Sequence, residues 1–280
     1  MMRKLYTFIQ WLSLDVALGA LASGGMVAWL LNVSMPLSWW IGLPLAVWIV
    51  YTLDHLLDAR RLKEKASTAR HLFHYTYQKV LLPIVILLSL VGIGLAFYLP
   101  LAILYAGLGI AAFVVLHLLL VKLVGDRTSL FFHKELGVGV IFSLGIWAGP
   151  WVMADYAALR PEAWLFCQYF ILVMINLLMF SKYELITDER DGHTSSVRAL
   201  GHRWTLRIIT GLSIIIIAIG ACLVFFSPLT EKLVGVQGIY LLMLTILVWI
   251  SYHPTLFEPK EAYRLWGDLA FVFPALYLFL

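Results

Sequence analysis

Two pairs of carboxylates stand out in this chain because each pair has helical spacing within largely apolar surroundings. Asp54 and Asp58 lie four residues apart, as do Glu184 and Asp188, and Asp191 follows three residues later. Residues four apart share one face of a helix, where like charges repel each other and need a compensating cation. Carboxylates are hard oxygen ligands suited to Mg²⁺, which shares its remaining positions with water and phosphate oxygens. These five residues are therefore the candidate ligands of Mg²⁺ ions that hold a diphosphate.

Basic and polar residues near these stretches are candidates for substrate binding. Arg70 stands at the end of the loop after the first pair, just before the next apolar segment. Lys122 and Arg127 belong to a third basic cluster. Membrane topology explains most basic residues in such loops, and one or two of them are expected to bind phosphate. The other two candidates are Asn176, for which a structural amide is the alternative, and Tyr183, for which an interfacial tyrosine is the alternative.

The elements that position these residues are membrane helices. The 280 residues are 62% hydrophobic and 13% charged, whereas soluble domains carry about 25% charged residues. A bilayer core needs roughly 20 mostly apolar residues per helix. Residues 1–280 are therefore expected to form one all-α membrane domain, a bundle of nine transmembrane helices. The nine segments are 10–32, 37–58, 80–99, 101–122, 134–154, 162–184, 205–227, 234–252 and 265–280.

The distribution of lysine and arginine predicts the orientation. With a cytoplasmic N-terminus, 18 of the 20 basic residues fall on the cytoplasmic side, and only Arg160 and Lys232 do not. Both acidic stretches then lie at that side, after the second and the sixth span. This arrangement suggests two pseudo-repeated halves around one site whose mouth opens to the cytoplasm. The expected location is a bacterial inner membrane.

The two acidic stretches resemble the two motifs of the intramembrane UbiA-type prenyltransferase superfamily. The first motif of that superfamily has the form N-D-x-x-D-x-x-x-D, and this chain reads V-Y-T-L-D-H-L-L-D from Val50 to Asp58. The last two aspartates match, while Val50 and Tyr51 replace the asparagine and the first aspartate. In the family a loop ending in a basic residue follows, and here S-T-A-R-H ends at Arg70 and His71.

The second motif, D-x-x-x-D followed by G-K-x-T and L-G, corresponds to three short stretches of this chain. Glu184–Asp188 takes the place of D-x-x-x-D with glutamate first, and Gly192–Ser195 and Leu200–Gly201 follow at matching spacing. The segment HKELGVGVIFSLGIWAGP also looks like the glycine-bearing fifth helix of the family. The resemblance covers the whole chain in architecture and is specific at the two motifs.

The resemblance implies an integral-membrane enzyme that moves a polyprenyl group from its diphosphate to an aromatic or other lipophilic acceptor. Mg²⁺ is the implied cofactor, and Asp54, Asp58 and Asp188 are the implied catalytic carboxylates. The expected partners are a polyprenyl diphosphate, the acceptor and membrane lipid. Nucleic acid is not expected, because the basic residues lie in short loops between spans.

Three alternatives remain beside this interpretation. The incomplete first motif favours an isoprenoid-binding homologue without turnover, whereas the retained acidic pairs argue against it. A small-molecule transporter would commonly bind its substrate near the midplane, whereas the charges here gather at one face. A phosphatidyl-transferring enzyme would also use Mg²⁺ and clustered aspartates, but Asp58-Ala59-Arg60 lacks the spacing of D-G-x-x-A-R.

Overall fold

The computed structural model describes residues 2–65, 68–124, 133–154, 159–191, 196–226 and 230–280, and all regular elements among them are helical. The first half contains α1 (Met2–Trp11), α2 (Leu14–Leu30), α3 (Leu37–Leu62), η1 (Lys63–Lys65), α4 (Ala69–Ala96), α5 (Leu101–Val124) and α6 (His133–Met153). The second half contains α7 (Leu159–Tyr183), α8 (Leu185–Asp191), α9 (Ser196–Leu200), α10 (His202–Phe226), α11 (Glu231–Tyr252), α12 (Pro254–Phe257), η4 (Pro259–Glu261), α13 (Ala262–Ala270) and η5 (Phe273–Phe279).

Seven helices of the described residues are long and apolar enough to cross a membrane, so the chain is a multi-pass membrane protein. These helices are α3, α4, α5, α6, α7, α10 and α11. The predicted count of nine spans is not confirmed, because the first and last predicted segments differ from single long helices. In the first segment the chain breaks at Ser13 (φ 53°), which leaves α2 with 17 residues. In the last segment α13 ends at Ala270, and the 3₁₀ helix η5 follows.

Helix α4 begins earlier than hydropathy predicts. The third span was expected over 80–99, but α4 starts at Ala69, and the side chain of Thr68 caps it by accepting a hydrogen bond from the backbone N–H of His71 (3.3 Å). Hydropathy misses this first part because the sequence ARHLFHYTYQK is polar, although it is still helical. Arg70 therefore lies in a helix and not in a loop.

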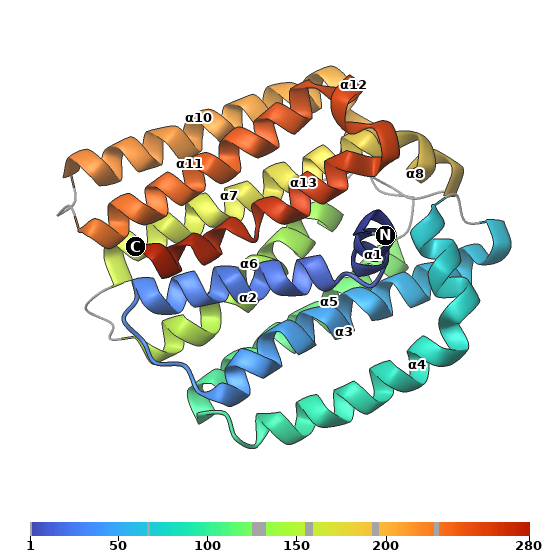
Figure 1. Cartoon of the computed structure of the whole chain (residues 1–280), viewed down its shortest axis with the longest axis horizontal. Helices are drawn as coiled ribbons and strands as arrows, with labels where there is room; N and C mark the ends of the chain where they lie inside the picture. The colour runs from blue at the N-terminus through green and yellow to red at the C-terminus, as the bar shows by residue number, and fades with distance from the viewer. Residues whose placement is uncertain (1, 66–67, 125–132, 155–158, 192–195, 227–229) are drawn as a thin grey trace.

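The long helices run side by side, with α7 and α11 in the interior of the bundle (Figure 1). In the most apolar window of α7, 56% of the residues are buried inside the protein, and the value for α11 is 50%, against 11% for α4 and α5. The main core cluster includes Trp147 of α6, Tyr169 of α7 and Tyr240 of α11, all fully buried. Helices α4 and α5 thus present most of their apolar surface outward, as expected for lipid-facing helices.

The short helices α1, α8 and α12 gather at one end of the bundle (Figure 1). Helices α3 and α7 end there, and α4 and α6 begin there. Both acidic stretches therefore lie at the same end, as the sequence predicts. A repeat relating the two halves stays a prediction, as does the cytoplasmic location of this end.

Candidate functional site

A cavity of about 220 Å³ lies where α2, α3, α4, α6, α7, α8 and α13 meet. Its charged lining residues are three cations and four acids, namely Arg70, Lys134, Arg264, Glu135, Glu184, Asp188 and Asp268. Its apolar lining residues are Val16, Val138, Phe142, Val173, Leu177, Phe180 and Phe271. The cavity therefore combines a strongly charged region with aliphatic and aromatic side chains.

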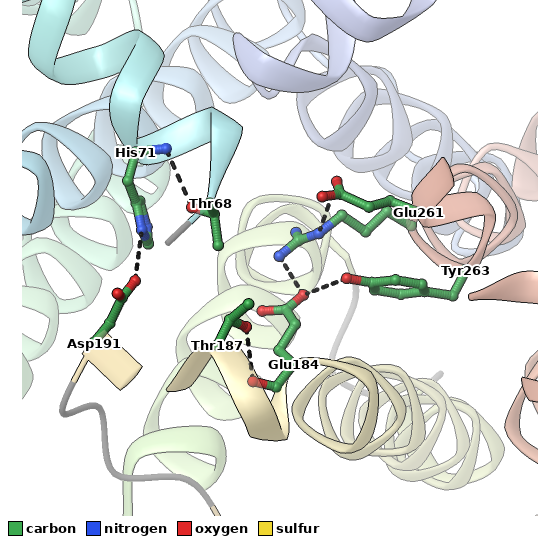
Figure 2. A network of polar contacts seen from close by, with 8 residues as sticks. Thr68, His71, Glu184, Thr187, Asp191, Glu261 and Tyr263 are labelled. Carbon is green, nitrogen blue, oxygen red and sulfur yellow. Dashed lines mark hydrogen bonds and ion pairs between the residues drawn. The ribbon is translucent and has the colours of Figure 1, made fainter. Parts of the chain in front are cut away.

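Glu184, at the junction of α7 and α8, already has a cationic partner in this cavity. Its carboxylate forms an ion pair with the guanidinium of Arg264 and accepts a hydrogen bond from the hydroxyl of Tyr263 at 3.5 Å (Figure 2). Arg264 is 7% exposed and also lies 3.9 Å from Glu261. The cation that neutralises Glu184 thus comes from α13, close to the C-terminal end of the chain.

Asp188 lies one helical turn after Glu184, because its backbone N–H donates to the Glu184 carbonyl at 2.8 Å. Burial and, after it, the negative charge of Glu184 raise the pKa of the Asp188 carboxyl to about 7, against the opposing effect of Lys134 and Arg264. Without a bound cation this carboxyl is therefore about half protonated near neutral pH. A cation bound beside it would favour the ionised form.

The first acidic pair is placed differently. Asp54 is exposed and Asp58 is half-buried, and neither belongs to the cavity lining. The residues of α3 that line the cavity are Tyr51 and His55. Lys134 nevertheless interacts electrostatically with Asp54 as well as with Asp188. Asp54 therefore lies near the cavity without forming its wall.

Arg70 and Asp191 connect α4 to the site in different ways. Arg70 lines the cavity, where Glu184 and Asp268 attract its guanidinium and Arg264 repels it. Its Nε is buried and has no hydrogen-bond partner among the described residues. Asp191 is directed towards His71, with 3.9 Å between a carboxylate oxygen and Nδ1 (Figure 2). This contact joins the end of α8 to the start of α4, and Asp191 is not part of the cavity lining.

The remaining predicted residues divide into three groups. Asn176 lines the cavity, and its buried side-chain oxygen has no hydrogen-bond partner among the described residues. Tyr183 lies outside the lining, since its hydroxyl donates to the Ile250 carbonyl (2.7 Å) and its ring stacks on Tyr263 at 4.3 Å. Arg127 lies outside the described residues, as does the side chain of Lys122 near the end of α5.

The cavity lining also includes His55, Glu135, Arg264 and Asp268, none of which was a sequence-based candidate. Glu135 is 6% exposed, and its carboxylate accepts hydrogen bonds from the Ser181 hydroxyl (3.2 Å) and the Ser196 backbone N–H (2.7 Å). The signal that would have found Glu135 and Asp268 is an ionisable residue inside a predicted span, which is a functional candidate by default.

Only part of the predicted metal site has a suitable arrangement. Within the described ranges no group of three or more His, Cys, Asp or Glu side chains is placed to hold a metal ion. Glu184 and Asp188 do line one cavity, one helical turn apart, and a cation bound beside them would favour the ionised form of Asp188. Mg²⁺ is often bound by one or two carboxylates together with substrate phosphates and water. The second acidic pair therefore fits a Mg²⁺ ion that is held jointly with a phosphate ligand.

No protein-family model matches this chain, and no curated protein matches it by sequence. A comparison with solved structures finds similarity to a digeranylgeranylglyceryl phosphate synthase in membranes. The identity is 14% and the TM-score is 0.55, over 98% of this chain and 99% of that chain. Over its whole length, this chain therefore shares the fold of a membrane-bound synthase.

Proposed function

We propose that this protein is a Mg²⁺-dependent prenyltransferase of the UbiA type, which transfers a polyprenyl group from its diphosphate to a lipophilic acceptor. The observation that carries the proposal is the set of side chains that lines the cavity. Three cations and the Glu184–Asp188 pair line the same cavity as seven apolar side chains. A prenyl diphosphate needs a charged region to bind its diphosphate head and an apolar region to bind its prenyl tail. The fold shared with a membrane-bound synthase supports the same function.

The cations would bind the diphosphate head. Arg70 and Arg264 present planar guanidinium groups that match phosphate oxygens, and Lys134 adds a compact positive charge. Mg²⁺ at Glu184 and Asp188 would neutralise charge on the departing diphosphate. Asp54 and Asp58 are the proposed ligands of the α3 half, acting at the edge of the cavity near Lys134. Lys122 and Arg127 remain proposed phosphate contacts.

The apolar lining would hold the first part of the prenyl chain. Breaking the bond between the allylic carbon and the diphosphate oxygen leaves both electrons on oxygen and produces an allylic carbocation. The aromatic faces of Phe142, Phe180 and Phe271 line the same cavity and would stabilise this positive charge. The acceptor then forms the new bond to the carbocation and loses a proton. Exclusion of water by the apolar wall protects the carbocation from hydrolysis.

The membrane orientation is part of the same proposal. The positively charged segments at the site end of the bundle support a cytoplasmic position for that end, in a bacterial inner membrane. A water-soluble diphosphate leaving group would then be released into the cytoplasm, while the lipid-soluble product remains in the bilayer.

The test measures diphosphate release by purified protein in nanodiscs that is given polyprenyl diphosphates of several lengths and a panel of aromatic and lipid acceptors. We expect Mg²⁺-dependent release that Asp188→Asn lowers on the order of 10²–10³-fold. Glu189→Gln is the matched control, because Glu189 is the exposed acidic neighbour on the same helix. Equal activity in Asp188→Asn and wild type would contradict the proposal.

The second candidate function is isoprenoid binding without turnover. It is favoured by Val50 and Tyr51 at motif positions where the family has an amide and a carboxylate, and by the absence of Asp54 and Asp58 from the cavity lining. The same samples distinguish the two functions. Mg²⁺-dependent binding of polyprenyl diphosphate without release, with every acceptor present, would identify a binding protein.

A further inference from the structure

His55 is a buried cavity residue that the proposed function has not yet used. It lies on α3 one turn after Tyr51, and both side chains line the cavity. His55 is 5% exposed, and neither of its ring nitrogens has a hydrogen-bond partner among the described residues. Buried polar atoms nearly always have a partner in native proteins. Two unpaired nitrogens in a cavity wall therefore indicate that a ligand supplies the partner.

The neighbours of His55 pack against its ring edge-on and leave its nitrogens unpaired. The centroid of its ring lies 6.3 Å from that of Tyr51, 6.0 Å from that of His71 and 5.1 Å from that of His74. His74 makes a different contact, since its Nδ1 lies 2.9 Å from the Arg70 carbonyl oxygen within α4. Of His55, His71 and His74, only His55 belongs to the cavity lining.

The chemistry next to His55 favours an anionic ligand. Arg70 lines the same cavity, interacts electrostatically with His55, and has a buried Nε with no hydrogen-bond partner among the described residues. A guanidinium offers only donors, and an imidazole offers at least one N–H donor. The walls formed by α3 and α4 thus contribute nitrogen donors to the cavity, whereas α7 and α8 contribute carboxylates.

We propose that His55 donates a ring N–H to the diphosphate of the substrate and forms, together with Arg70, a metal-independent anion subsite. This inference rests on the proposed function and adds one substrate-binding residue to it. The α3 wall then holds the diphosphate through nitrogen donors at the place where the first motif has lost its first carboxylate. Substitution of His55 should accordingly weaken anion binding by the same factor with and without Mg²⁺.

The test uses inorganic pyrophosphate and calorimetry on the full-length protein, with Mg²⁺ and with EDTA. His55→Phe keeps a ring of similar shape and removes the N–H, and we expect it to raise the Kd about tenfold in both conditions. His55→Gln, which restores a donor, should recover part of the affinity. His74→Phe is the matched control from the same cluster and should change the Kd less than about twofold. In protein labelled with ¹⁵N-histidine, the ring resonance that is missing from His55→Phe should shift when pyrophosphate is added to wild type.

The outcomes separate this inference from the proposed function. Binding that is lost in Arg70→Met and Asp188→Asn but unchanged in His55→Phe would overturn the role of His55 and leave the function standing. Equal losses in His55→Phe and His74→Phe, with a lower unfolding temperature in both, would show that the ring is structural and would also overturn it. If wild type bound neither pyrophosphate nor any polyprenyl diphosphate, the proposed function itself would fail.

Discussion

The two acidic pairs have the same spacing in the sequence and very different surroundings in the structure. Glu184 and Asp188 line the cavity, with Arg264 bound to Glu184. Asp54 and Asp58 lie outside the lining, next to it on α3. The spacing determines that two residues share a helix face, but the rotation of the helix decides which face meets the cavity.

The rotation of α3 follows from its buried stripe. Trp48, Thr52, His55 and Ala59 are all buried and recur every three or four residues, so they form the face that packs inward. Asp54 and Asp58 each lie one residue before a member of this stripe, and they therefore point to one side of it. Packing of the whole stripe thus outweighs any tendency of two carboxylates to reach the cavity.

The largest expected effect contrasts the two pairs in catalysis. Asp188→Asn should lower turnover on the order of 10²–10³-fold, because removing one preorganised charge stabiliser commonly costs that much. Asp58→Asn should lower it less than about tenfold, since Asp58 lies outside the cavity wall. Steady-state rates of diphosphate release for both variants measure the difference. Equal losses in the two variants would contradict this contrast between the two acidic pairs.

The next largest effect concerns Arg264, the cation that forms an ion pair with Glu184. Arg264→Met leaves Glu184 without its partner, and we expect a loss of about 2 kcal/mol in stability, below the value for fully buried pairs because the Glu184 side chain is 18% exposed. Mg²⁺ should restore part of this loss by replacing the guanidinium. Thermal unfolding with and without Mg²⁺ measures both quantities. Lys260→Met, on the exposed segment before α13, serves as the control.

The smallest effect is a pH dependence of stability that Asp188 in the second pair should produce. The pKa of Asp188 is raised to about 7 in the folded protein, above the ordinary value of an aspartate. The stability from this group is therefore complete at low pH and is lost as the pH rises through 7. Metal-free protein should accordingly unfold at a lower temperature at pH 8 than at pH 6, and Asp188→Asn should flatten this slope. A slope that persists in Asp188→Asn would assign it to another group.

Much of the fold was predictable from the sequence. Long apolar runs predict the seven long helices correctly because lipid-facing helices need an unbroken apolar surface. The two ends of the chain were less predictable, because the break at Ser13 and the 3₁₀ segment η5 interrupt stretches that are apolar enough to predict continuous helices. The early start of α4 was missed because its first turns are polar, and hydropathy does not distinguish a polar helix from a loop.

The site was predictable only where a local motif was sufficient. Glu184 and Asp188 are four residues apart, and this spacing predicted that they lie one helical turn from each other. The backbone hydrogen bond between them confirms this prediction. The partnership of Glu184 with Arg264 joins residues 80 positions apart, and no local pattern predicts it. The placement of His55 in the wall depends on how α3 rotates against its neighbours, which is also a property of the tertiary packing.

The most direct test of the account is the Mg²⁺-dependent binding of a polyprenyl diphosphate by two paired variants, measured by calorimetry in nanodiscs. One variant carries Glu184→Gln and Asp188→Asn, and the other carries Asp54→Asn and Asp58→Asn. We predict that the first variant loses the Mg²⁺-dependent part of the affinity, while the second retains most of it. Retention in the first variant and loss in the second would contradict the central claim that the cavity-lining pair Glu184 and Asp188 is the principal Mg²⁺ and diphosphate site.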